Sequence, residues 1–74
     1  MKSDPREKFV ELAEKRVNNT LRGIRLIGNL SNASNYSYTD EDVSKIYRTL
    51  RKALEEMKNR FVRRGLSEKE SFKL

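Results

Sequence analysis

Hydrophobic residues recur at steps of three and four along two segments of the chain, the spacing of amphipathic helices. In residues 5–29 the apolar series is Phe9, Val10, Ala13, Val17, Thr20, Leu21, Ile24 and Ile27. In residues 40–64 it is Val43, Ile46, Tyr47, Leu50, Ala53, Leu54, Met57 and Phe61. This pattern predicts an all-α chain with a first helix over about 5–29, a loop over 30–39 and a second helix over about 40–64.

Residues that favour helix ends support these bounds. Candidate N-caps precede both segments, Ser3 or Asp4 before the first and Thr39 or Asp40 before the second. Pro5 suits a first helical turn, and Glu7 stands where the carboxylate of a capping box would reach back. Gly65 predicts the end of the second helix and leaves residues 65–74 as a C-terminal tail.

The two predicted helices have matched lengths, about 35 Å each at 1.5 Å per residue, which predicts an antiparallel two-helix hairpin forming a single domain over residues 1–74. Leu12, Leu26 and Leu30 lie to one side of the first apolar series, so the first helix needs a second partner. A domain of this size seldom gains more than ~3–5 kcal/mol from one core. We therefore expect hairpins to assemble into a homo-oligomeric helical bundle.

Two glycines fall inside or at the end of the first predicted helix. Glycine within a helix costs about 0.5–1 kcal/mol relative to alanine, so Gly23 predicts the close approach of another backbone or a ligand. The same interpretation is open for Gly28, but there the helix can simply end.

Several function classes are disfavoured by composition. The chain has no His and no Cys, so none of its serines has a histidine base, and we predict no enzymatic activity, no metal and no cofactor. No apolar run approaches the ~18 residues that span a membrane, and the N-terminus lacks the apolar segment of a signal peptide. We expect a cytoplasmic protein without a membrane partner.

Residues 15–39, here called the acid-free window, contain no Asp or Glu, although the chain has 11 acidic and 17 basic residues. Four cations, five asparagines, three serines and two tyrosines lie in it. Such a surface suits an anion with hydrogen-bonding edges or a flat ring, such as a nucleotide. The candidate ligand-binding residues are Arg22, Arg25, Asn29, Ser31, Asn32, Asn35, Tyr36 and Tyr38. The alternative is a surface loop in which Asn and Ser satisfy their own backbone.

A second basic group lies on the predicted second helix, roughly opposite its apolar series: Lys45, Arg48, Lys52 and Arg63. Repeated in an oligomer, this face would follow a nucleic-acid backbone without reading its sequence. A solvated helix face explains the same residues.

Three functions remain open from the residues. The first is a non-enzymatic binding protein that holds a nucleotide-type anion. The second is sequence-independent DNA or RNA binding. The third is a protein-interaction module or inhibitor that uses the apolar surface around Leu12 and Leu26.

The segments IRLIGNLSN, YSYT and DVSKI, at residues 24–32, 36–39 and 42–46, resemble those of small helical proteins of bacteria and their mobile elements. That resemblance carries no established activity and implies no site residue. In size, charge and expected assembly the chain is also similar in general type to phage counter-defence proteins. Some of those sequester nucleotide signals, and others block nucleic-acid channels.

Overall fold

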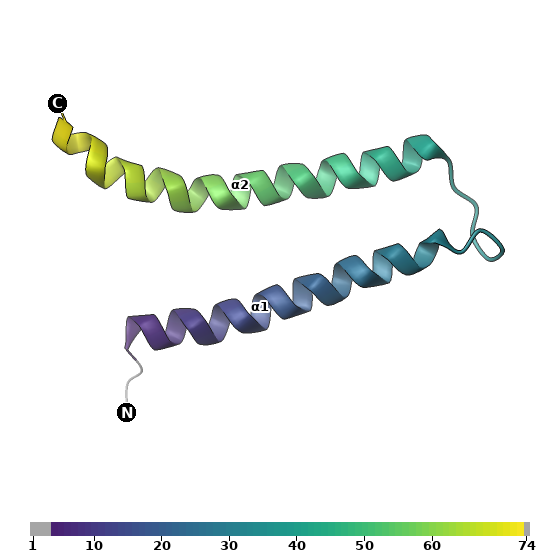
Figure 1. The fold of residues 1–74 in the computed structure, drawn as a ribbon, viewed down its shortest axis with the longest axis horizontal. Coiled ribbons are helices and arrows are strands. Elements are labelled where there is room, and N and C mark those ends of the chain that lie inside the picture. Colours follow the sequence, from purple (N-terminus) through teal and green to yellow (C-terminus); the bar gives the residue numbers. More distant parts are fainter. Residues whose placement is uncertain (1–3, 74) are drawn as a thin grey trace. The chain divides into compact units, whose positions relative to one another are not determined.

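The computed structural model describes residues 4–73, and the side chains of residues 4–64. Over that range the chain forms α1 (Pro5–Gly28), a short 3-10 helix η1 (Asn29–Ser31) and α2 (Asp40–Lys73) (Figure 1). Residues 4–73 contain no strand, so the all-α prediction with two long helices is confirmed. The chain divides into two units, Met1–Ser37 with α1 and η1, and Tyr38–Leu74 with α2.

α1 begins with a side-chain cap. The Asp4 carboxylate accepts a hydrogen bond from the backbone N–H of Glu7 at 2.8 Å, and Pro5 occupies the first helical position. One of the unpaired N–H groups of the first turn is thereby satisfied, and Pro5 has no N–H to satisfy. Asp4 is therefore the cap that the sequence predicted as one of two candidates; Ser3 lies outside the described residues.

α1 ends by tightening into η1. The α-helix stops at Gly28, and the backbone N–H of Asn29 is directed at the carbonyls of Arg25, Leu26 and Ile27. Gly28 has φ −60° and ψ −29°, an ordinary right-handed conformation. The predicted end at residue 29 is thus correct to one residue. The first two residues of the predicted loop belong to η1.

α2 begins with a reciprocal capping box. The Thr39 hydroxyl accepts from the backbone N–H of Asp42 at 3.0 Å, and the Asp42 carboxylate accepts from the backbone N–H of Thr39 at 3.0 Å. Asp40, Glu41 and Asp42 fill the first turn, where negative charge interacts favourably with the helix dipole. Of the two predicted caps, Thr39 is the one used, and Asp40 is the first helical residue.

α2 continues to Lys73, so the predicted end near residue 64 and the predicted tail over 65–74 need correction. The prediction gave Gly65 the role of a helix stop. One glycine costs a helix only about 0.5–1 kcal/mol. Leu66, Glu68 and Lys69, which follow it, are strong helix formers that offset this cost.

No side chain among the described residues is buried. The large apolar side chains of the two stripes remain exposed, from 36% for Ile27 to 61% for Tyr47, and Val10, Leu12 and Ala13 are partly buried. A Cβ atom added at Gly23 would meet nothing within 4 Å, so the close approach predicted there is not made within the chain. Both stripes are therefore available to further helices.

Candidate functional site

One polar face of α1 carries two of the three arginines of the acid-free window, Arg22 and Arg25. Successive helical residues turn by 100°, so Arg22 and Arg25 lie about 60° apart, and Asn29 follows between them at the start of η1. Asn18 lies on the same side, one turn before Arg22. We call these four residues the arginine face. All four are exposed, and they lie about 80–140° around the helix axis from Val17 of the apolar stripe.

The two arginines have different local partners. The Arg22 guanidinium donates to the Asn19 side-chain carbonyl at 3.2 Å, a bond along the helix surface between residues three apart. Guanidinium has five N–H donors, so one such bond leaves donors for a ligand. Arg25 occupies the last turn of α1, where a cation also interacts favourably with the helix dipole.

The loop after η1 folds on Asn32. The Asn32 side-chain carbonyl accepts from the backbone N–H of Ser34 at 3.2 Å and from the Ser34 hydroxyl at 2.7 Å. The Asn32 backbone carbonyl accepts from the N–H groups of Asn35 and Tyr36, both at 3.0 Å. The bond from the Ser34 N–H to the Asn32 side chain is that of an Asx turn, and the backbone bonds close the same turn, so at Asn32 the alternative interpretation of a self-capped loop is supported.

The predicted ligand residues are only partly brought together. Arg22, Arg25 and Asn29 share one helix face, and Ser31 ends η1. Asn32, Asn35 and Tyr36 form the turn that follows in the same unit, with Tyr36 49% exposed. Tyr38, 41% exposed, belongs to the unit that contains α2, so the structure does not join it to the arginine face.

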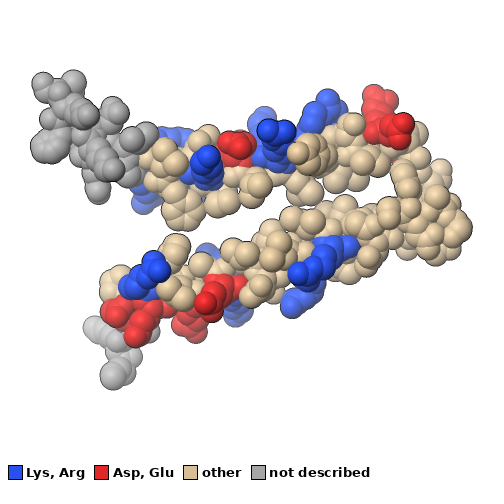
Figure 2. Space-filling view, viewed as in Figure 1, with Lys and Arg blue, Asp and Glu red and all other residues tan. Residues whose placement is uncertain are grey.

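The charges around the arginine face are unevenly distributed along the chain. On the face that Figure 2 shows, acidic side chains gather in the first part of α1 and at the start of α2. Glu14 is the last carboxylate before the window, and Asp40 is the first after it. Along α1, Arg22 and Arg25 are therefore at least two turns away from any carboxylate of their own helix.

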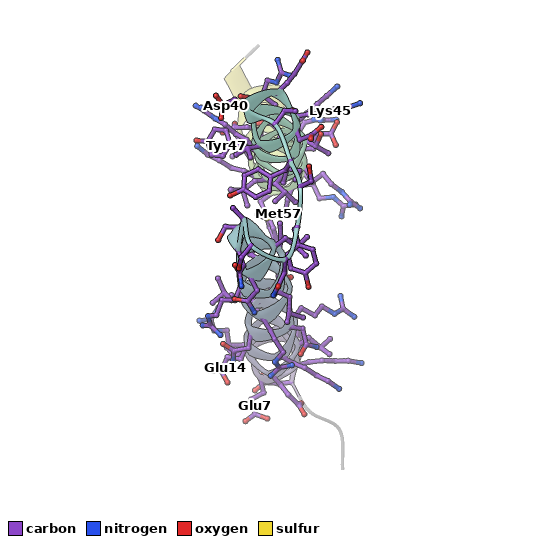
Figure 3. The ribbon with its side chains drawn as sticks, turned by 90° about the vertical axis from the view of Figure 1, so that its right-hand side faces the viewer. Glu7, Glu14, Asp40, Lys45, Tyr47 and Met57 are labelled. Carbon is purple, nitrogen blue, oxygen red and sulfur yellow. The ribbon has the colours of Figure 1, made fainter. Side chains whose placement is uncertain are left out.

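The basic group of α2 also lies on one face. Lys45, Arg48, Lys52 and Arg63 fall within about 60° of one another around the helix axis. In Figure 3, Lys45 and Tyr47 point to opposite sides of α2, as expected for cations opposite the apolar stripe. The same face carries Glu55 and Glu56 between Lys52 and Arg63, so its positive charge is interrupted.

Asn18 and Asn19 lie at the candidate site but are not among the residues that the sequence predicts for it. The spacing of residues 18, 22, 25 and 29, in steps of four, three and four, was a sufficient signal for the shared face. The bond from Arg22 to Asn19 follows the i, i+3 spacing of neighbours on a helix surface. Both asparagines were considered only as part of the composition of the window.

Within the described residues, no group of three or more His, Cys, Asp or Glu side chains is arranged to hold a metal ion. The part of the chain searched has no helix that is both long and apolar enough to cross a membrane. Chemically, the exposed groups around the arginine face offer cationic donors, amides and the Tyr36 ring, a combination that suits the binding of an anion.

Comparisons with known proteins find no family model, no curated protein and no solved structure that matches the chain. By its structure, the chain is a small all-α protein with two amphipathic helices and exposed polar faces.

Proposed function

We propose that the protein is a non-enzymatic binding protein, a homo-oligomer of antiparallel helical hairpins that holds a nucleotide-type anion at the arginine face of α1. The observation that carries this proposal is the presence of Arg22, Arg25 and Asn29 on one exposed face without a carboxylate in the surrounding window. In this proposal the cytoplasmic protein sequesters the nucleotide, as some phage counter-defence proteins of similar general type do.

The donors of the site fit the parts of such a ligand. Guanidinium groups bind phosphate oxygens through paired N–H donors, a task for Arg22 and Arg25. The Asn29 amide has both a donor and an acceptor, as base edges and ribose hydroxyls require. Tyr36 lies in the turn after η1 and has an exposed ring on which a base can stack.

Self-association is supported by the exposed apolar stripes. Side chains such as Phe61 and Leu26, each 60% exposed, are stabilised once another helix removes them from water. Charge favours an antiparallel hairpin, because it would set Glu7 and Glu11 of α1 against the basic segment around Arg63 of α2.

Native mass spectrometry of protein purified gently from cells is the first test. An oligomer with additional mass equal to that of a nucleotide would support the proposal and identify the ligand. A monomer would contradict the assembly, and an oligomer without added mass would favour nucleic acid or protein as the partner.

Mutation then tests whether the nucleotide binds at the arginine face. The double variant R22A/R25A should lose affinity for the identified nucleotide by about tenfold or more, equal to about 1.4 kcal/mol. The matched control R48A/K52A removes two charges from α2 and should change the affinity much less. Equal losses would indicate a general effect of net charge, and an unchanged R22A/R25A variant would refute the site.

Sequence-independent nucleic-acid binding is the second candidate, favoured by the shared face of Lys45, Arg48, Lys52 and Arg63. Its affinity for duplex DNA should fall steeply with salt, with a slope of about −0.9 per phosphate contacted. Fluorescence anisotropy of labelled DNA at several salt concentrations measures that slope. Binding that does not respond to salt would exclude this candidate.

A further inference from the structure

α1 and the first turn of η1 carry a second helical line that the main apolar stripe does not use. Its members follow steps of four, three, four, three and four residues, the spacing of a coiled-coil seam. We call the following residues the second seam: Leu12, Arg16, Asn19, Gly23, Leu26 and Leu30. Leu26 is 60% and Leu30 47% exposed, and the space around Gly23 is open to 4 Å.

The composition of the second seam disfavours pairing with a parallel copy of itself. In a parallel pair every residue faces its own copy, so Arg16 would face Arg16 of the second copy in the seam. Like charges brought together away from water are destabilising. Gly23 would also face Gly23 of the second copy and leave the middle of the seam without side chains.

An antiparallel pair removes both difficulties. In one antiparallel register, the numbers of facing residues sum to 42. Leu12 then faces Leu30 of the second copy, Arg16 faces Leu26 and Asn19 faces Gly23, and each contact occurs twice because the two copies are equivalent. The Arg16 stem then covers Leu26 of the second copy while its charge reaches water. The Asn19 side chain occupies the space left by Gly23 of the second copy. This register uses all six members of the seam.

We infer that α1 packs antiparallel on α1 of a second copy through the second seam, about a two-fold axis between Asn19 and Gly23. The inference rests on the proposed self-association and names its interface. In this arrangement the apolar surface around Leu12 and Leu26 is covered by a second copy of this chain. It also explains why a glycine is placed in the middle of α1, where an isolated helix would favour alanine.

The two edges of this interface differ in chemistry. One edge consists of Ala13, Thr20 and Ile27, which belong to the main apolar stripe and remain available to the hairpin core. The other edge consists of Lys15, Arg22 and Asn29. In an antiparallel pair each edge meets the same edge of the partner, so Arg22 lies beside Arg22 of the second copy.

This arrangement makes the anion site a shared one. Two guanidinium groups side by side repel each other and are best satisfied by a ligand with at least two negative charges, such as the phosphates of a nucleotide. Asn19 is hydrogen-bonded to Arg22 at 3.2 Å in the same chain, which holds the guanidinium at the edge of the seam. Binding should therefore strengthen the pairing of the two copies.

Cysteine cross-linking tests the register, and the chain has no cysteine of its own. Two single variants, L12C and L30C, are oxidised separately and as a mixture. The antiparallel register predicts a disulfide-linked dimer only in the mixture, whereas a parallel pair predicts one in each variant alone. The variants K15C and N29C, joined by a short bis-maleimide linker, repeat the test without removing a leucine from the seam.

The control is N18C, which lies outside the seam and should form few cross-linked dimers in any combination. If native mass spectrometry gives a monomer, the proposed self-association fails. If it gives an oligomer but neither mixture cross-links better than its single variants, the interface inferred here is wrong while self-association stands.

Inorganic pyrophosphate tests the shared site directly. It should raise the dimer fraction of the wild-type protein, measured by analytical ultracentrifugation near the dissociation midpoint. The effect should be lost in R22Q and retained in R48Q, which removes a charge from α2. An equal response of R22Q and R48Q would overturn the sharing of the anion by the two copies.

Discussion

Replacement by alanine should have opposite effects at Thr39, the N-cap of α2, and at Thr49, within α2. The Thr39 hydroxyl accepts from the backbone N–H of Asp42 at 3.0 Å and is half of the capping box. The Thr49 hydroxyl donates to the backbone carbonyl of Lys45 at 2.7 Å, within the helix, where that carbonyl already has a helical partner. T39A therefore removes a bond that the backbone needs, and T49A removes one that it does not.

The expected magnitudes follow from these roles. Replacing an N-cap threonine by alanine costs about 1 kcal/mol, and T39A should lower the free energy of unfolding by this amount. T49A should raise it by a few tenths of a kcal/mol, on the order of the difference in helix propensity between alanine and threonine. The difference between the two variants, about 1–1.5 kcal/mol, is well above the error of a urea titration.

Urea unfolding followed by circular dichroism at 222 nm measures both variants. All proteins are compared at one concentration, because the stability of an oligomer depends on concentration. Asp42→Asn keeps a hydrogen-bond acceptor without charge and should fall between wild type and T39A. A T39A variant as stable as T49A would refute the assignment of Thr39 as the cap that begins α2.

Three further substitutions test other local features. Asp4→Ala should cost about 1 kcal/mol and speed amide exchange at Glu7, because the 2.8 Å bond to that N–H is lost; unchanged exchange would contradict the cap. Asn32→Ala should speed amide hydrogen exchange at Ser34 and leave the circular dichroism of the helices unchanged. A loss of helicity would show that the turn also stabilises the helices. Gly28→Ala should raise the helicity and increase the free energy of unfolding by up to about 1 kcal/mol, since the new Cβ meets nothing within 4 Å and φ is already −60°. A loss of stability would indicate that Gly28 lies against another chain or a ligand.

Much of the secondary structure could be predicted from the sequence, because local chemistry determines it. Steps of three and four residues identified both helices, and Asp4 and Thr39 were among the caps named. The end of α2 could not be found from Gly65 alone, since the helix propensity of the residues after it outweighs one glycine. A helix end depends on the sum over a turn or more, whereas the prediction rested on one residue.

The candidate site was predictable only in part. Residue types in the acid-free window indicated anion-binding chemistry, but composition does not distinguish a side chain that faces a ligand from one that folds its own loop. The structure makes that distinction at Asn32, whose side-chain carbonyl is used by Ser34. It also adds Asn18 and Asn19 to the surroundings of Arg22, through helical phase and a hydrogen bond.

Assembly and binding are linked if the interface and the shared anion are both as inferred. Helices in proteins gain most of their stability from packing against other elements, and none of the described side chains is buried in the single chain. Folding of each copy is then supported by the partner that covers its second seam. A ligand held by Arg22 of both copies binds the pair and not the separate chains, so it stabilises the pair by about 2.7 kcal/mol at one hundred times its dissociation constant. Helicity at low protein concentration should therefore rise with added nucleotide, and the rise should disappear when Arg22 is replaced by glutamine.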